Sequence, residues 1–324
     1  MKRRAPHDVA REARILSRTR HDSIVALLAS FTEQPDDFEQ LHWLAMPLYE
    51  TDLGTLLDSD QWGVDGDLPQ QATGGLTFAP FVRQLLCETA DGIAYLHATG
   101  IAHRDIKPSN ILVDRGHCVL CDFGVAWESD VPERASFDDS DAPLVLGARV
   151  PEVGTGAYRA PELLFAPVNG YDAYKVDVWA FGATIATMFC QLHVEEERRE
   201  TTEWEDELWP RAQKTLCHRV TLFDASHSDI GMACDIFSVL GLPTDVSDWP
   251  EAAHFQPPLD QMPFARAGPS GSVLDRLPLL EHVSRSGPAG AELASVIADL
   301  LPQMIVLSAA SRPHAASIAA ALAP

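Results

Sequence analysis

Apolar residues at the start of the chain recur every three or four positions and then give way to short continuous runs. The helical spacing predicts an amphipathic helix over residues 6–20, because a 3.6-residue period places these side chains on one face. The apolar runs at 24–28 and 41–46 are bounded by polar turn residues and predict two strands. One helix and two strands make only a small and incomplete sheet layer.

Helical spacing dominates the rest of the chain. Apolar residues recur at three- and four-residue offsets over residues 77–100, where a final glycine is a common helix stop. The stretch Val176–Phe189 is apolar on nearly every side and predicts a helix buried in the core. Its Asp177 would be costly to bury without partners. Two further alanine-rich helices are expected over residues 291–307 and 313–323.

Between these helices the pattern predicts one hairpin and several irregular segments. Ile111–Val113 and Cys118–Leu120 are short apolar runs joined by a turn sequence, which is typical of a β-hairpin. Residues 128–152 combine acidic residues and prolines without periodicity and are expected to form a loop. Residues 194–207 form an acidic, glutamate-rich insert, and residues 257–290 are proline-rich and expected to be irregular surface chain.

The composition narrows the class of protein. With 324 residues and 46% hydrophobic content, the chain has ample core material for one large domain or two ordinary ones. Its formal net charge of -23 would repel phosphate backbones and anionic lipids, so neither nucleic acid nor a membrane is an expected partner. No apolar run reaches the roughly eighteen residues of a membrane span, and the start lacks the apolar region of a signal peptide. A soluble intracellular protein of the nucleus or cytoplasm is expected.

One stretch carries the chemistry of the chain. His103-Arg104-Asp105-Ile106-Lys107-Pro108-Ser109-Asn110 is followed, after the predicted hairpin, by Asp122-Phe123-Gly124. Transfer of a phosphoryl group from a nucleotide needs a base to orient the attacking hydroxyl, cations to neutralise the triphosphate, and carboxylate or amide groups to hold those cations. The two motifs supply each of these groups at the spacing of the protein-kinase signature.

On these motifs the chain resembles the eukaryotic protein kinases, and the resemblance extends from about residue 6 to residue 322. It implies that Asp105 accepts the proton of the substrate hydroxyl and that Lys107 steadies the transferred phosphate. Asn110 and Asp122 would hold Mg²⁺, so the implied cofactors are ATP and Mg²⁺. A catalytic loop retained only for its fold would not need all four polar groups.

Further matches to the family imply supporting roles. Glu162, which ends the Ala-Pro-Glu motif, would pair with Arg312 in a buried bridge. Thr155 resembles the residue of serine/threonine kinases whose hydroxyl bonds the catalytic aspartate and lysine. Asp177 matches the residue that braces the backbone of the catalytic loop, which would solve the cost of burying it. The resemblance therefore implies a serine/threonine kinase.

The resemblance also implies where ATP binds. Met46 falls at the gatekeeper position, and Pro47 and Tyr49 lie in the hinge, where their backbone groups would bond adenine. A proline is compatible with a position at which the carbonyl is used, since proline retains its carbonyl. Asp52 follows the hinge and is included in the site, and Leu112 would line the floor beneath adenine.

Within the kinases, the chain resembles the CMGC group and its cyclin-dependent branch. Residues 6–12 resemble the PSTAIRE helix of that branch, with the proline, arginine and glutamate retained, and residues 235–243 fit the branch as well. The divergent helix and the catalytic loop are similar to those of the fungal monomeric kinases that activate cyclin-dependent kinases. A protein substrate is thus implied, with either a cyclin-like activator or none.

The residue that cyclin-dependent kinases phosphorylate aligns with Val150, which has no hydroxyl. A carboxylate at a fixed position can supply the negative charge that a phosphate would bring. We therefore hypothesise that Glu152, or the acids at 138–141, supply this charge to Arg104 and Arg11.

Two parts of the family pattern are missing. The N-lobe of a kinase opens with a glycine-rich loop over the phosphates and a Val-Ala-Ile-Lys strand, whose lysine pairs with a glutamate of the helix. Glu12 is the matching glutamate and is expected to belong to the ATP site, but only Lys2 lies upstream of it. Either the sequence is an N-terminally truncated form of an active kinase, or the chain is a pseudokinase or binding scaffold.

Together these observations predict an α+β protein with the two-lobed protein-kinase fold, a truncated N-lobe and a mainly α-helical C-lobe. The N-lobe is expected over residues 1–49 and the C-lobe over residues 50–324, with the acidic insert near 194–207. The expected activity is transfer of the γ-phosphate of ATP to serine or threonine of protein substrates. With so few strands, the N-lobe sheet should expose an edge, and the helix should expose one face.

Overall fold

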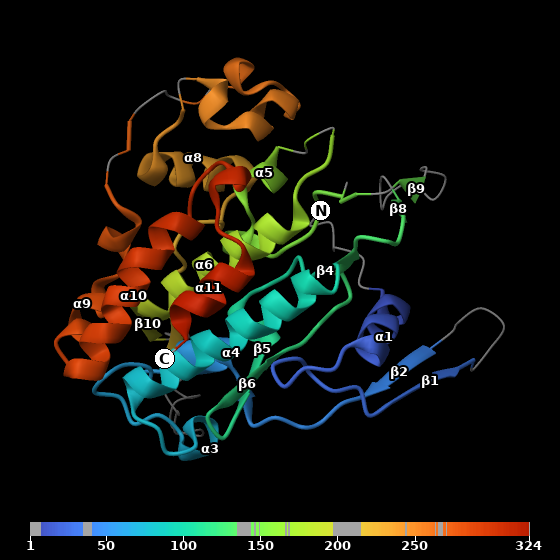
Figure 1. The fold of residues 1–324 in the computed structure, drawn as a ribbon. Helices are drawn as coiled ribbons and strands as arrows, with labels where there is room; N and C mark the ends of the chain where they lie inside the picture. Colours follow the sequence, from blue (N-terminus) through green and yellow to red (C-terminus); the bar gives the residue numbers. More distant parts are fainter. Residues whose placement is uncertain are drawn as a thin grey trace, which may run out of the picture.

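The computed structural model describes residues 8–34, 41–134, 144–145, 147–148, 150–165, 167, 169–196, 215–243, 245–262, 264, 268–269 and 271–323. Figure 1 shows a helical body that contains most of the chain and, beside it, a small unit of one helix and two strands from the start of the sequence. This arrangement confirms the predicted α+β fold with a small sheet-bearing N-lobe and a helical C-lobe. Among the described helices, none is both long and apolar enough to cross a membrane.

The N-lobe helix α1 spans Val9–Arg18, within the stretch predicted to be helical. Asp8 caps its first turn, because the Asp8 carboxylate accepts a hydrogen bond from the backbone N–H of Arg11 at 3.0 Å. Ile15 and Leu16 are buried beneath the helix, as the amphipathic pattern predicts. The remaining side chains of α1 are half-buried or exposed.

The two N-lobe strands are β1, Ala29–Glu33, and β2, Leu41–Ala45, which pair antiparallel. The prediction of the first strand at residues 24–28 is wrong. That run is apolar because its first residues are buried against the C-lobe, where the N–H of Val25 donates to the carbonyl of Leu120 at 3.0 Å. β1 itself is exposed along its whole length.

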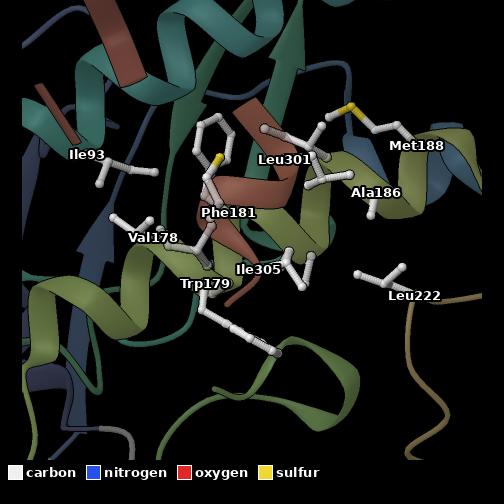
Figure 2. Packing of buried hydrophobic residues seen from close by; sticks show 14 of the residues in the cluster. Ile93, Val178, Trp179, Phe181, Ala186, Met188, Leu222, Leu301 and Ile305 are labelled. Carbon is white, nitrogen blue, oxygen red and sulfur yellow. The ribbon is translucent and has the colours of Figure 1, made fainter. Parts of the chain in front are cut away.

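The C-lobe is built on four helices that the hydrophobic pattern predicts. They are α4 (Phe78–Ala98), α6 (Ala173–Phe189), α10 (Pro288–Met304) and α11 (Ala315–Leu322). Every residue of α6 from Lys175 to Phe189 is buried, so this helix lies at the centre of the lobe. Figure 2 shows the side chains that pack around it, among them Ile93 of α4, Leu301 of α10, Ile305 and Leu222.

The other described helices of the C-lobe are α2 (Leu53–Leu57), α3 (Gln70–Thr73), α5 (Pro161–Leu164), α8 (Asp229–Leu240) and α9 (Pro278–Ser284). Short 3₁₀ turns occur at Pro108–Asn110, Gly156–Tyr158, Val246–Asp248, Pro250–His254, Leu259–Gln261, Val273–Arg276 and Ala309–Ser311. The stretch 257–290 is expected to be irregular, but its described residues include α9, two 3₁₀ turns and the start of α10.

Short antiparallel sheets position the catalytic segments. β5 (Ile111–Asp114) and β6 (His117–Leu120) form the predicted hairpin, and β3 (Thr51–Asp52) adds to β5. β4 (Ile101–Ala102), directly before the His-Arg-Asp motif, pairs with β7 (Trp127–Glu128), which follows the Asp-Phe-Gly motif. Because β4 and β7 hold the two ends of the intervening chain together, the two motifs lie side by side.

Two further ladders fall in segments that the sequence predicts to be irregular. β8 (Glu133–Arg134) pairs with β9 (Leu144–Val145) within the expected loop at 128–152. β10 (Leu192–Glu196) pairs with β11 (Thr215–Arg219), and residues 197–214 between them, which include most of the acidic insert, lie outside the described part of the chain. Polar, aperiodic sequence does not reveal such local pairs, because strand formation depends strongly on neighbouring side chains.

Candidate active site

Three side chains form a closed set of hydrogen bonds at the catalytic loop. Lys107 Nζ donates to Asp105 Oδ2 at 2.7 Å and to Thr155 Oγ1 at 2.8 Å. Thr155 Oγ1 in turn donates to Asp105 Oδ1 at 2.7 Å. Asp105 is only 5% exposed, so its carboxylate is largely removed from water and the ammonium beside it offsets its charge. These are the contacts that the resemblance to serine/threonine kinases implies.

Asn110 completes the surroundings of this carboxylate. It ends the 3₁₀ turn at Pro108–Asn110, and its Nδ2 donates to the carbonyl of Asp105 at 2.9 Å and to Asp105 Oδ2 at 3.2 Å. A carboxylate has about four acceptor positions, and Lys107, Thr155 and Asn110 occupy three of them. Among the described residues, these donors leave about one acceptor position of the carboxylate unused.

The backbone of the catalytic loop is held by Asp177, a fully buried residue of α6. Its carboxylate accepts hydrogen bonds from the backbone N–H groups of His103 at 2.8 Å and Arg104 at 2.7 Å, and it lies 2.9 Å from His97 Nε2 of α4. Arg104 has a φ of 65°, a left-handed conformation that is uncommon for residues with side chains, and its bond to Asp177 holds it there. Asp177 thus braces the loop as the resemblance implies, and these partners compensate its burial.

The Asp-Phe-Gly segment lies directly beside the catalytic loop. The N–H of Cys121 donates to the carbonyl of Asn110 at 3.0 Å, which places Asp122 next to Asn110. Phe123 is fully buried, and its ring centre lies 4.9 Å from that of His103. Burial, followed by the negative charge of Asp122, raises the pKa of the Cys121 thiol to about 12. The thiol is therefore neutral and adds no charge to the site.

Asn110 and Asp122 offer oxygen atoms of the kind that Mg²⁺ prefers as ligands. The amide of Asn110 uses its nitrogen to hold Asp105, so its oxygen is the atom that can bind a cation. Asp122 adopts a φ of 68°, and its Oδ1 lies 3.4 Å from the donating N–H nitrogen of Gly124. Proteins usually hold Mg²⁺ by one or two carboxylates together with phosphate oxygens and water. The two side chains therefore fit a complex of Mg²⁺ with a nucleotide.

Glu12 of α1 reaches the same segment from the N-lobe. Its carboxylate accepts a hydrogen bond from the N–H of Phe123 at 3.3 Å. Close to it, the N–H of Asp8 donates to the carbonyl of Gly124 at 3.0 Å. The structure thus places the predicted glutamate against the Asp-Phe-Gly backbone, while Lys2 lies outside the described residues.

The residues predicted to contact adenine are brought together only in part. Asp52 of β3 and Leu112 of β5 are direct cross-strand partners. The Asp52 carboxylate caps α2, where it accepts a hydrogen bond from an N–H of the first turn at 3.0 Å. Tyr49 is half-buried against the core, and this burial raises its pKa, with the charge of a nearby aspartate as the next cause. Met46 is exposed and Pro47 half-buried after β2, so contact with adenine stays a prediction.

A second buried charge pair lies on the substrate side of the loop. Arg312 donates to both carboxylate oxygens of Glu162, at 2.7 and 2.8 Å, and both side chains are almost completely buried. The Arg312 guanidinium also lies 5.0 Å from the ring centre of Trp179. This confirms the predicted bridge, which joins α5 to the chain before α11.

The hypothesis that Glu152 or the acids at 138–141 supply a fixed negative charge in place of a phosphate stays a prediction. Glu152 is exposed. The Nε of Arg104 donates to the carbonyl of Val125 at 2.8 Å. The acids at 138–141 lie outside the described residues.

The sequence did not predict the cavity beside the catalytic loop. This cavity has a volume of about 310 Å³ and adjoins both Lys107 and Thr155. His218 and Arg219 of β11 form part of its wall. No motif pointed to these residues, because they follow the acidic insert in a stretch without clear periodicity.

A group of charged residues between α1 and β7 was also missed. Glu128 of β7 is buried, and its carboxylate accepts hydrogen bonds from Arg14 and Arg18 of α1. The only sequence signal was the spacing of the two arginines, which are four residues apart and therefore share a helix face. Their partner lies more than a hundred residues away in sequence, which spacing cannot reveal.

A small lobe of one helix and two strands, a helical lobe, and a catalytic loop beside an Asp-Phe-Gly segment together define the protein-kinase class of fold. The sequence matches the family described as protein kinase domain over residues 1–320. The chain belongs to that family.

Several kinases are similar in sequence to this chain. Mitogen-activated protein kinase 12 of Homo sapiens is 32% identical over 181 residues, which are 55% of this chain and 40% of that protein. The serine/threonine kinase NLK of Caenorhabditis elegans is 32% identical over 182 residues, which are 56% of this chain and 24% of that protein. The chain thus spans less than half the length of these relatives. Both agree with the resemblance to the CMGC kinases, and neither supports the alternative of a pseudokinase.

A solved structure gives the same class of fold. It is the crystal structure of the yeast RNA Pol II CTD kinase CTDK-1 complex, in which one chain matches this one with a TM-score of 0.61. The match covers 96% of this chain and 78% of that chain at 19% sequence identity. At this identity the likeness shows a shared fold.

Proposed function

We propose that the chain transfers the γ-phosphate of ATP to the hydroxyl group of serine or threonine in protein substrates. The observation that carries this proposal is the hydrogen-bonded set of Asp105, Lys107 and Thr155. In it, a nearly buried carboxylate is fixed by an ammonium on one oxygen and by a hydroxyl on the other. The relatives in sequence, which include a serine/threonine kinase by name, support the same activity.

In this proposal Asp105 is the base that receives the proton of the attacking hydroxyl. Its carboxylate keeps one acceptor position after its bonds to Lys107, Thr155 and Asn110. A hydroxyl bound at that position directs its oxygen toward the γ-phosphorus of ATP and passes its proton to Asp105. The new O–P bond forms as the bond from the γ-phosphorus to the bridging oxygen breaks, and ADP leaves with the electron pair of that bond. The rigid surroundings matter because positioning provides most of the rate in phosphoryl transfer.

Lys107, Asn110 and Asp122 are assigned to the phosphates. An ammonium has three donor positions, and Lys107 uses two of them for Asp105 and Thr155. We assign the third to the transferred phosphate. Asn110 and Asp122 would hold Mg²⁺. When bound, this cation would neutralise part of the charge of the triphosphate.

We assign the nucleotide site and the boundary between the two lobes from the resemblance to the kinases. Adenine is assigned to the stretch Met46–Tyr49, with Asp52 and Leu112 beside it. Glu12 is assigned to the phosphate end of the same site, because it already contacts the Asp-Phe-Gly backbone. The N-lobe is placed at residues 1–49 and the C-lobe at the rest of the chain.

The acceptor segment of the protein substrate is assigned to the cavity beside Lys107 and Thr155. A cyclin-like activator is a second candidate partner. Residues 6–12 resemble the PSTAIRE helix, and the yeast kinase with the similar fold was solved as a complex.

Substitution of Asp105 tests the activity directly. Asp105→Asn removes the base while keeping the shape of the side chain, so we expect phosphate transfer to serine- and threonine-containing peptides to fall by about a hundredfold or more. The measurement is transfer of labelled phosphate from Mg-ATP by the full chain. Asp299→Asn, an exposed position on α10 far from the catalytic loop in the sequence, is the matched control and should leave transfer unchanged.

Two results would overturn the proposal. One is undiminished transfer by Asp105→Asn. The other is an unsubstituted chain that transfers no phosphate and shows no thermal shift with Mg-ATP.

A further inference from the structure

Glu128 occupies a position between the N-lobe helix and the catalytic loop. It is the second residue of β7 and lies opposite Ile101 in the pairing of β7 with β4. The next residues after β4 are His103 and Arg104, whose backbone is bonded to Asp177. The Glu128 carboxylate therefore belongs to the same rigid ladder as the start of the catalytic loop.

This carboxylate is buried and is bonded on both of its oxygens by α1. Glu128 is 3% exposed. Arg14 donates to its Oε1 through Nε at 3.2 Å and through Nη2 at 2.5 Å, and Arg18 donates to Oε2. An exposed ion pair would contribute little to stability. Here, by contrast, removal of the arginines would leave a buried charge without a partner, which is strongly unfavourable.

The same helix also contacts the Asp-Phe-Gly segment near its N-terminal end. Glu12 accepts the N–H of Phe123, and the N–H of Asp8 bonds the carbonyl of Gly124. Ile15 and Leu16 bury the apolar face of α1, but apolar packing has no direction and would tolerate a rotation or a slide of the helix. Hydrogen bonds of fixed geometry remove that freedom.

We propose that Glu128 is a positioning residue that sets the place of α1 through Arg14 and Arg18. By holding the C-terminal half of the helix, it keeps Glu12 in contact with the segment that carries Asp122. The chain thus holds this helix with ion pairs of its own. The proposal concerns regulation of the kinase site and rests on the proposed function only for its effect on transfer.

Glu128→Gln tests the proposal because it keeps the size of the side chain and removes its charge. We expect amide hydrogen exchange in Val9–Arg18 to become about tenfold faster or more, the effect of losing one hydrogen bond to a charged group. Exchange in α6 should stay unchanged. For transfer, kcat/KM for Mg-ATP should fall by about tenfold while KM for the peptide stays constant, since only the N-lobe side of the site moves. Glu128→Asp, which keeps the charge, should restore part of both effects.

The controls separate positioning from general stability. Glu281→Gln removes an exposed ion pair with Arg285 on α9 and should change neither measurement. If Glu128→Gln does not fold, the double substitution of the exposed Arg14 and Arg18 to glutamine should give the same faster exchange in α1. Unchanged exchange in α1, or an equal increase in α1 and α6, would overturn the proposal. Hydrogen exchange is measured without substrates. It therefore tests the role of Glu128 even if the chain transfers no phosphate.

Discussion

Asp177, Glu162 and Glu128 are carboxylates that are almost completely removed from water, and each accepts hydrogen bonds from at least two donors. An unpaired carboxylate in such surroundings would cost several kcal/mol. The donors of each one come from a different part of the chain. Asp177 thus connects α6 and α4 to the catalytic loop. Glu128 connects β7 to α1, and Glu162 connects α5 to the chain before α11.

The cysteines give a prediction at the same scale. Burial raises the pKa of Cys118, and it raises the pKa of Cys121 and of Cys190 to about 12 in each case. Only the thiolate reacts with alkylating agents, so these thiols should stay unreactive at pH 8. Cys234 is exposed and should be alkylated first.

Mass spectrometry after a short treatment with iodoacetamide at pH 8 measures this order, with the urea-unfolded chain as the control. In urea, all four cysteines should react at similar rates. Rapid labelling of Cys121 in the folded chain would contradict the burial of its thiol. At pH 9 the labelling of Cys121 should still be slow.

At the residue scale, spacing identified most of the polar groups of the site. Asp105, Lys107 and Asn110 lie close together because they share one short loop, whose local geometry follows from its sequence. Asp177 and Glu162 could be assigned only through the family resemblance, and the structure confirms their contacts. The pairing of Glu128 with α1 could not be predicted, since a contact between segments this far apart depends on the whole fold.

Among the elements, long periodic segments were predicted well and short ones were not. α4 and α6 match their predicted ranges closely, because many apolar positions at one spacing leave little ambiguity. Ile24 and Val25, the first residues of the run at 24–28, are apolar for a different reason, namely their burial against β6. A short apolar run indicates that residues are buried. Burial alone does not show whether an extended segment pairs with a neighbouring strand.

The bridge between α5 and the chain before α11 can be tested by Glu162→Gln. The substitution leaves the buried Arg312 without its negative partner, so the free energy of unfolding should fall by about 3 kcal/mol. Urea denaturation followed by circular dichroism measures the change.

Glu292→Gln is the control for this measurement, because Glu292 is largely exposed in its pair with Arg83. The control should lower the free energy of unfolding by less than about 1 kcal/mol. Equal effects of the two substitutions would show that the buried bridge contributes no more than a surface pair.

For the whole molecule, the small N-lobe sheet carries large apolar side chains that are exposed. Phe31 of β1 and Trp43 of β2 are 58% and 48% exposed. Their rings are stacked, with ring centres 6.1 Å apart. Beside them Leu28 is also exposed. Exposed apolar side chains that lie together in this way favour association.

Phe31→Ser together with Trp43→Ser should reduce self-association of the chain. Light scattering during size-exclusion chromatography should show a smaller average mass at equal concentration, with the unfolding temperature of the chain nearly unchanged, because these side chains lie outside the core. Val194→Ser is the control, since Val194 is equally exposed at 58% but lies on β10. A double variant that associates as strongly as the unsubstituted chain would exclude this surface as the cause.

Heating commonly loosens the loops of a protein before its core melts. The catalytic loop of this chain is attached differently, because the N–H groups of His103 and Arg104 are bonded to Asp177 of the buried helix α6. These bonds tie the backbone of the loop to the core of the lobe. We therefore expect the catalytic loop and the C-lobe to lose their structure in one thermal transition, and a substitution in the α6 core to lower the midpoint of that transition.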